Sequence, residues 1–110
     1  MFDFRTTLRE AEEAVKNNHI GIATFNYWQI NFAYNDEEFP DGCTTEMLCY
    51  AEEKFRYYAF NHTYEIFSDK SYILYRAYSY KNKYLENFER VMNSIIRKKN
   101  SSDMSEFALF

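Results

Sequence analysis

Hydrophobic and polar residues follow different periods along the chain, and these periods predict its elements. Residues 8–17 carry a thin apolar face at helical spacing. Thr7 and Glu10 stand before it in a capping-box arrangement, and Asn17 with Asn18 provides a stop. The apolar face consists of Leu8, Ala11 and Val15. The pattern predicts a first helix over residues 8–17, which the residues before Thr7 can extend.

Residues 19–34, HIGIATFNYWQINFAY, show strand-like alternation, because six large apolar side chains occupy even-numbered positions. They are Ile20, Ile22, Trp28, Ile30, Phe32 and Tyr34. β-branched and aromatic residues dominate the segment, as in strands. We therefore expect one long strand or a hairpin, with a kink near residues 24–26. The alternative is a helix that brings Phe25, Trp28 and Phe32 to one side.

A second helix is expected after residues 35–43, which form a loop with a Pro-Asp-Gly turn. Thr44 or Thr45 can cap this helix, and it should end near Asn61. Its apolar face consists of Met47, Leu48, Ala51, Phe55, Tyr58 and Ala59. Residues 63–67 are expected to form a short strand or a connector.

The last predicted element is a long helix over residues 72–99, about 42 Å in length at 1.5 Å per residue. Its apolar residues keep one phase along the whole segment. They are Ile73, Leu74, Ala77, Tyr78, Tyr84, Leu85, Phe88, Val91, Met92, Ile95 and Ile96. The alternative is a strand through the tyrosines that breaks at residues 81–83.

These elements predict an α+β fold: a helix, a strand pair, a helix, a connector and a long C-terminal helix. The alternative is an all-α bundle. The absence of Gly and Pro after residue 42 favours helices over a β fold with many turns. We expect residues 1–100 to form a single compact domain and residues 101–110 to form a C-terminal tail.

Charge divides the chain into two halves. Residues 1–53 hold eleven acidic and three basic residues, and residues 54–110 hold six acidic and ten basic residues, so the net charge of −4 is the sum of −8 and +4. On one continuous helix, four basic residues spaced by seven would form a cationic stripe facing solvent. They are Arg76, Lys83, Arg90 and Arg97, with Tyr72, Tyr75 and Tyr80 beside them. A partner-binding surface is one interpretation, and an ordinary solvated helix face is the other.

Two further segments are candidate partner sites. Asp36, Glu37 and Glu38 form an acidic loop that could imitate phosphates, or simply be solvated. Phe107 and Phe110 belong to an apolar segment that follows a polar linker. This segment could dock on its own domain or enter the groove of a partner.

Catalytic and metal-binding motifs are missing from the sequence. The two glycines cannot supply a phosphate-binding loop, and Cys43, Cys49, His19 and His62 lack the spacing of a common zinc site. We expect Cys49 to lie in the core. Cys43 precedes a helix N-terminus, a position that can lower the pKa of a thiol. We expect neither an enzyme nor a cofactor or metal. No signal peptide or membrane span is predicted, which indicates a cytoplasmic protein.

Aromatic residues make up 21% of the chain, more than a core of this size easily buries, and tyrosine is favoured at interfaces. We therefore expect a small non-enzymatic protein-binding module. In its specific form, the hypothesis is an inhibitor of a host enzyme or defence complex, encoded by a phage or mobile element, since residues with A/T-rich codons abound. One alternative is a nucleic-acid accessory protein that uses the cationic stripe and its tyrosines. The other is a self-associating structural or regulatory module, such as a homodimer.

Overall fold

The computed structural model describes residues 3–35, 42–79 and 84–100. Within these ranges the chain forms six helices and no strand. They are α1 (Phe4–Lys16), α2 (Ile20–Asn35), α3 (Thr45–Asn61), α4 (Thr63–Ser68), α5 (Lys70–Ser79) and α6 (Leu85–Asn100). The all-α alternative therefore agrees with the structure, and the expected α+β fold with its strand pair is wrong.

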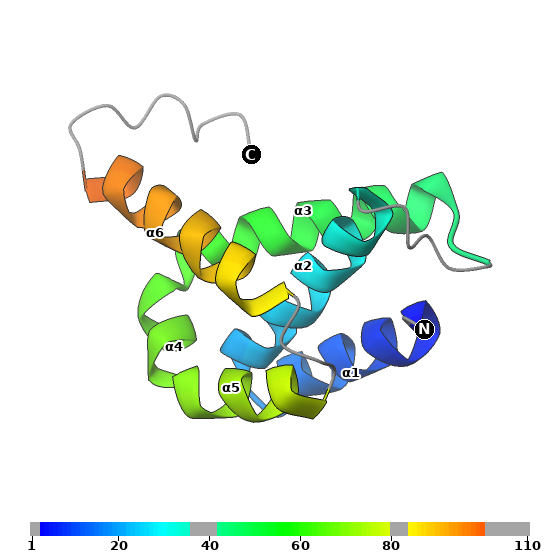
Figure 1. The fold of residues 1–110 in the computed structure, drawn as a ribbon, viewed down its shortest axis with the longest axis horizontal. Coiled ribbons are helices and arrows are strands. Elements are labelled where there is room, and N and C mark those ends of the chain that lie inside the picture. The colour runs from blue at the N-terminus through cyan, green and yellow to red at the C-terminus, as the bar shows by residue number, and fades with distance from the viewer. Residues whose placement is uncertain (1–2, 36–41, 80–83, 101–110) are drawn as a thin grey trace.

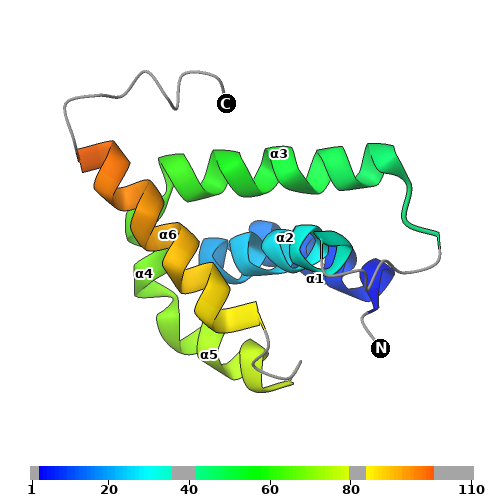
Figure 2. The same ribbon diagram turned by 45° about the horizontal axis from the view of Figure 1, so that its top comes forward.

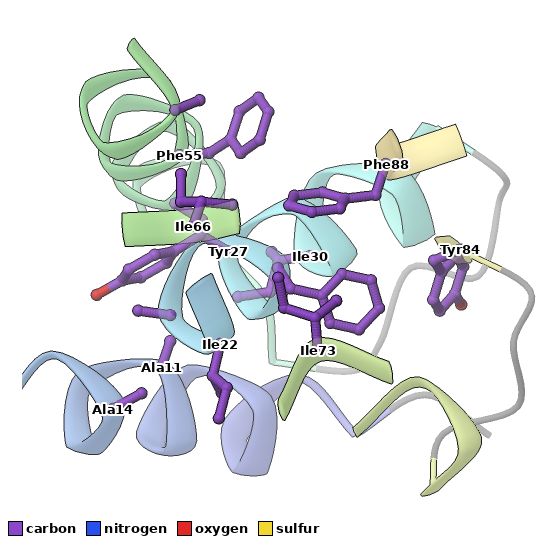
Figure 3. Packing of buried hydrophobic residues seen from close by; sticks show 14 of the residues in the cluster. Ala11, Ala14, Ile22, Tyr27, Ile30, Phe55, Ile66, Ile73, Tyr84 and Phe88 are labelled. Atoms are coloured by element: carbon purple, nitrogen blue, oxygen red, sulfur yellow. The ribbon is translucent and has the colours of Figure 1, made fainter. Parts of the chain in front are cut away.

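Helix α2 is the central element, and α1, α3, α4 and α5 all pack against it (Figure 1). Helix α6 lies across α3 (Figure 2). It also reaches α2 through Phe88, whose ring meets the Phe25 ring edge-on at 5.2 Å between centroids. In Figure 3 side chains from α1 to α6 converge on α2. The core is thus built around one helix rather than between two layers.

The surroundings of α2 explain why the strand prediction for this segment is wrong. Nearly every residue from Ile20 to Ala33 is buried, including the polar Thr24. Apolar side chains therefore lie on all sides of the helix, as expected for a helix without a solvent face. Such a helix has no 3.6-residue polar period, so the alternation of its large residues resembles a strand.

Local signals set both ends of α1. Asp3, not Thr7, is the N-cap: its carboxylate accepts hydrogen bonds from the Thr6 N–H at 3.1 Å and the Thr6 hydroxyl at 2.7 Å. These bonds lower the pKa of Asp3 below its ordinary value. At the other end Asn18 has φ of 63°, and the His19 N–H donates to the Ala14 carbonyl at 2.8 Å. The expected stop at the two asparagines is therefore confirmed, in the form of a Schellman motif.

Helix α3 has the expected cap and length. The Thr44 hydroxyl accepts a hydrogen bond from the Met47 N–H at 3.2 Å, and the helix ends at Asn61. Residues 63–67, expected to be a strand or connector, lie instead within the short helix α4. His62 ends one helix and precedes the next, so the chain bends there without a loop.

A close crossing at Gly21 joins α2 to α4 and α5. The Gly21 N–H donates to the Asp69 carboxylate at 2.9 Å, which satisfies one free donor at the start of α2. A Cβ atom at position 21 would lie 2.5 Å from the Asp69 Cβ. Glycine is therefore required here by close packing rather than by an unusual φ.

The single long helix predicted for residues 72–99 is wrong. The chain forms α5 and α6 instead, and α6 turns back over α4 and α5 rather than extending the axis of α5 (Figures 1 and 2). The strand alternative for this segment is wrong as well. The apolar phase is similar in the two halves because both helices bury one face, a pattern that does not require them to be collinear.

Candidate functional site

Four tyrosines and one histidine form a contiguous aromatic group on α2 and α3, which we name the tyrosine cluster. Its members are Tyr27, Tyr50, Tyr57, Tyr58 and His62. The Tyr27 ring contacts the Tyr50 ring edge-on at 6.1 Å and stacks on the Tyr58 ring at 6.2 Å between centroids. The Tyr57 and His62 rings extend the group, at 5.4 Å and 5.6 Å from that of Tyr58. Each ring therefore has at least one aromatic neighbour.

Tyr27 is the buried base of the cluster, with only 1% of its surface exposed. In Figure 3 its ring lies between α1 and α3, with the hydroxyl directed away from Ile30 and Phe88. Burial raises the pKa of Tyr27 strongly, and the neighbouring Tyr50 hydroxyl and the Glu12 carboxylate raise it further. The phenol therefore stays neutral over the physiological pH range, and the base of the cluster carries no charge.

The exposed edge of the cluster belongs to α3. Tyr57 is 53% exposed and Tyr50 is 37% exposed, although both rings are also packed against other rings of the cluster. Tyr64, which follows in α4, is 82% exposed. These three tyrosines recur every seven residues, about two helical turns within α3. Aromatic surface is thus presented along α3 and at the start of α4.

Charged side chains border the cluster. The Lys54 ammonium lies 5.6 Å from the centroid of the Tyr50 ring, within the range of a cation–π contact. The Glu65 carboxylate lies 3.6 Å from His62 Nδ1. The cluster thus has neutral aromatic rings at its centre and polar groups at its edge.

The proposed cationic stripe does not assemble as predicted. Its members lie on two helices with different directions, and Arg76 forms an ion pair with Glu10 of α1. Arg90 and Arg97 are exposed on α6. Lys83 lies outside the described residues. The described basic residues therefore do not form one continuous row.

The predicted tyrosines of the same segment have separate environments. Tyr72 is half exposed, and its ring stacks on the ring of His19 at 4.6 Å with an interplanar angle of 24°. Tyr75 is 68% exposed on α5. Tyr80 lies outside the described residues. Tyr72 is thus part of the joint between α5 and the start of α2, and only Tyr75 presents most of its surface to solvent.

The acidic loop and the apolar tail residues also lie outside the described residues, so the predictions for them remain predictions. These residues are Asp36, Glu37, Glu38, Phe107 and Phe110.

The prediction that Cys49 lies in the core is wrong. Cys43 is buried and Cys49 is exposed, contrary to the expectation for α3. Burial raises the pKa of the Cys43 thiol, the opposite of the lowering that a helix N-terminus can produce. Among the described residues no group of three or more histidine, cysteine or acidic side chains could hold a metal ion. None of the described helices combines the length and apolar character needed to cross a membrane.

Comparison with protein-family models, with curated proteins and with solved structures gives no match for this chain.

The tyrosine cluster was not predicted, although a signal for it is present in the sequence. Projection of α3 places Tyr50 and Tyr57 on the face opposite Ala51 and Phe55, which points to an aromatic solvent face. Only the contribution of Tyr27 could not be foreseen, because its segment was expected to be a strand. The density of tyrosines in residues 70–84 pointed to α5 rather than to α3.

Proposed function

We propose that this chain is a small protein-binding module and that the tyrosine cluster is its contact surface. The observation that carries the proposal is that the Tyr50 and Tyr57 rings are partly exposed to solvent while contacts with neighbouring rings hold them in place. Tyrosine is enriched at the few interface positions that supply most of the binding free energy. Its ring adds apolar contact area while its hydroxyl can find a new partner.

Preorganisation supports this choice of surface. Immobilising a flexible side chain on binding costs about 0.5–1.5 kcal/mol. The Tyr57 ring is already confined by Tyr58 and His62, so less of this cost remains to be met when a partner binds.

The other hypotheses fit these contacts less well. The nucleic-acid hypothesis needed a row of four basic residues, and Arg76 instead pairs with Glu10. Self-association stays open as one form of protein binding, with a second copy as the partner. Inhibition of a host enzyme or defence complex is the most specific form of the proposal, and the test is whether the partner loses activity when bound.

Affinity measurements on matched variants test the proposal. The intact chain is first used to capture partners from cells that express it, and the affinity of each captured protein is then measured for Tyr57→Ala and Tyr75→Ala. We expect Tyr57→Ala to weaken binding about 10- to 30-fold, because a loss of about 1.4–2 kcal/mol is typical of a central interface tyrosine. Tyr75→Ala, an equally large truncation on α5, should change the affinity less than about threefold.

Circular dichroism should show that both variants remain folded. If Tyr57→Ala binds as tightly as the unaltered chain, the tyrosine cluster is not the contact surface. Light scattering over a range of concentrations identifies the case in which the partner is a second copy.

A further inference from the structure

An apolar pocket of about 100 Å³ opens between α4, α5 and α6, away from the tyrosine cluster. Its floor is formed by buried side chains from all three helices, and partly exposed Phe67 and Leu74 form its wall. The floor residues are Ile66, Ile73, Phe88 and Met92. Lys70, Glu89 and Asn93 are exposed at its rim. The interior of the pocket is thus apolar, and its opening is polar.

The size and lining of the pocket suit one apolar side chain. An enclosed apolar cavity of about 150 Å³ can hold a benzene molecule. A pocket of about 100 Å³ that is open at one side can therefore take a leucine side chain, or a phenylalanine ring that protrudes in part. A ligand of this kind needs a polar segment next to its apolar group, because the rim is charged.

We propose that the apolar segment at residues 107–110 docks in this pocket of its own chain. The segment reads Phe-Ala-Leu-Phe and supplies three large apolar side chains. The pocket and this segment, rather than the tyrosine cluster, carry the inference, so it stands independently of the proposed partner surface.

The connecting chain is long enough for this docking. Asn93 lies seven residues before the end of α6, which is about 10 Å along the helix at 1.5 Å per residue. Seven residues from Asn100 to Phe107 span up to about 23–25 Å when extended. Phe107 can therefore return along α6 to Asn93 and still turn sideways into the pocket.

Charge at the rim also fits this segment. Glu106 immediately precedes Phe107. No described carboxylate forms a salt bridge with Lys70. With Phe107 in the pocket, the Glu106 carboxylate would lie near the rim, where Lys70 can pair with it.

Tethering makes even weak docking effective. A short flexible linker gives the tethered segment an effective concentration on the order of 1 mM. A segment whose free peptide bound with a dissociation constant on the order of 1 mM would therefore occupy the pocket about half of the time. A separate partner peptide has no such advantage at cellular concentrations.

Nuclear Overhauser contacts in the intact, isotope-labelled chain test the proposal. We expect cross-peaks between the aromatic protons of Phe107 or Phe110 and the methyl groups of Leu74 and Met92. The cross-peaks of each phenylalanine should disappear when it is replaced, in Phe107→Ser or in Phe110→Ser. Leu74→Ala should weaken the remaining contacts to Met92, whereas Tyr75→Ala, at a neighbouring position outside the pocket, should leave them unchanged.

A mixture of labelled and unlabelled chains then separates docking within a chain from docking between chains. Cross-peaks that persist only within labelled chains support the proposal. Cross-peaks between labelled and unlabelled chains would show that a second copy supplies the segment, and the proposal would be wrong. A complete absence of contacts between residues 107–110 and the pocket methyl groups would also refute it.

Discussion

Helices α2 and α6 both have 16 residues, but α2 lies at the centre of the molecule and α6 lies at its periphery. Side chains on every side of α2 are buried, whereas only Phe88, Met92 and Ile95 are buried on α6. Helix α6 keeps a polar face toward solvent and a clear 3.6-residue period, and α2 has neither. The helix whose sequence pattern was easiest to interpret is therefore the one that contributes less to the core.

This contrast also bears on the two proposed binding sites. The tyrosine cluster is anchored on α2 through Tyr27, which fixes the rings that α3 exposes. The pocket lies where α6 crosses α4 and α5. The central helix thus supports a preorganised surface, and the outer helix leaves room for an apolar group.

Matched isoleucine truncations should give the largest difference between the two helices. Ile30 of α2 is 1% exposed and Ile96 of α6 is partly exposed. We expect Ile30→Ala to lower the free energy of unfolding by about 2–5 kcal/mol, because it leaves a cavity that cannot collapse. Ile96→Ala should lower it by less than about 1.5 kcal/mol. Urea denaturation of both variants measures these values, and equal losses would contradict the central role of α2.

Substitution by alanine should change the stability of the fold in opposite directions at one position of α2 and one position of α6. Replacing a helical glycine by alanine usually stabilises a helix by about 1 kcal/mol. At Gly21 the added Cβ would meet the Asp69 Cβ, so we expect Gly21→Ala to destabilise the fold by about 1–3 kcal/mol. At the exposed position Asn93 of α6, replacement by alanine should stabilise the fold slightly, by roughly a few tenths of a kcal/mol.

The same denaturation experiment has an internal control for Gly21. The cost of Gly21→Ala should shrink in an Asp69→Gly background, where the opposing Cβ is gone. An unchanged cost there would mean that the crossing with Asp69 is not the cause.

The last comparison concerns buried polar side chains, which α2 contains and the buried face of α6 does not. Among the described residues, neither the nitrogen nor the oxygen of the buried Asn26 side chain has a hydrogen-bond partner, and leaving such a group unpaired costs about 1–3 kcal/mol. We expect Asn26→Leu to raise the free energy of unfolding by about 1 kcal/mol. The control is Asn31→Leu, since the Asn31 Nδ2 donates to the Tyr27 carbonyl at 3.2 Å. A loss of stability at both positions would indicate that Asn26 does have a partner in solution.

Prediction from the sequence succeeded where the interactions are local. Thr44 and the two asparagines after α1 marked helix ends correctly, because caps depend on residues within one turn. Prediction failed for α2, whose helical state is stabilised by packing against four other helices. It also failed for Cys49, since the side of a helix that becomes buried depends on what packs against it.

For the candidate surface too, some features are local and visible in the sequence, and others arise only from tertiary packing. The seven-residue spacing of Tyr50, Tyr57 and Tyr64 is visible in the sequence. The residues that end helices are visible there as well, because a helix end depends on backbone geometry over only a few residues. The pairing of Arg76 with Glu10, the turn of α6 back over α5 and the ring of Tyr27 beneath α3 arise only after folding. These contacts join residues far apart along the chain, and their geometry is set by how the helices pack around α2, which no local pattern specifies.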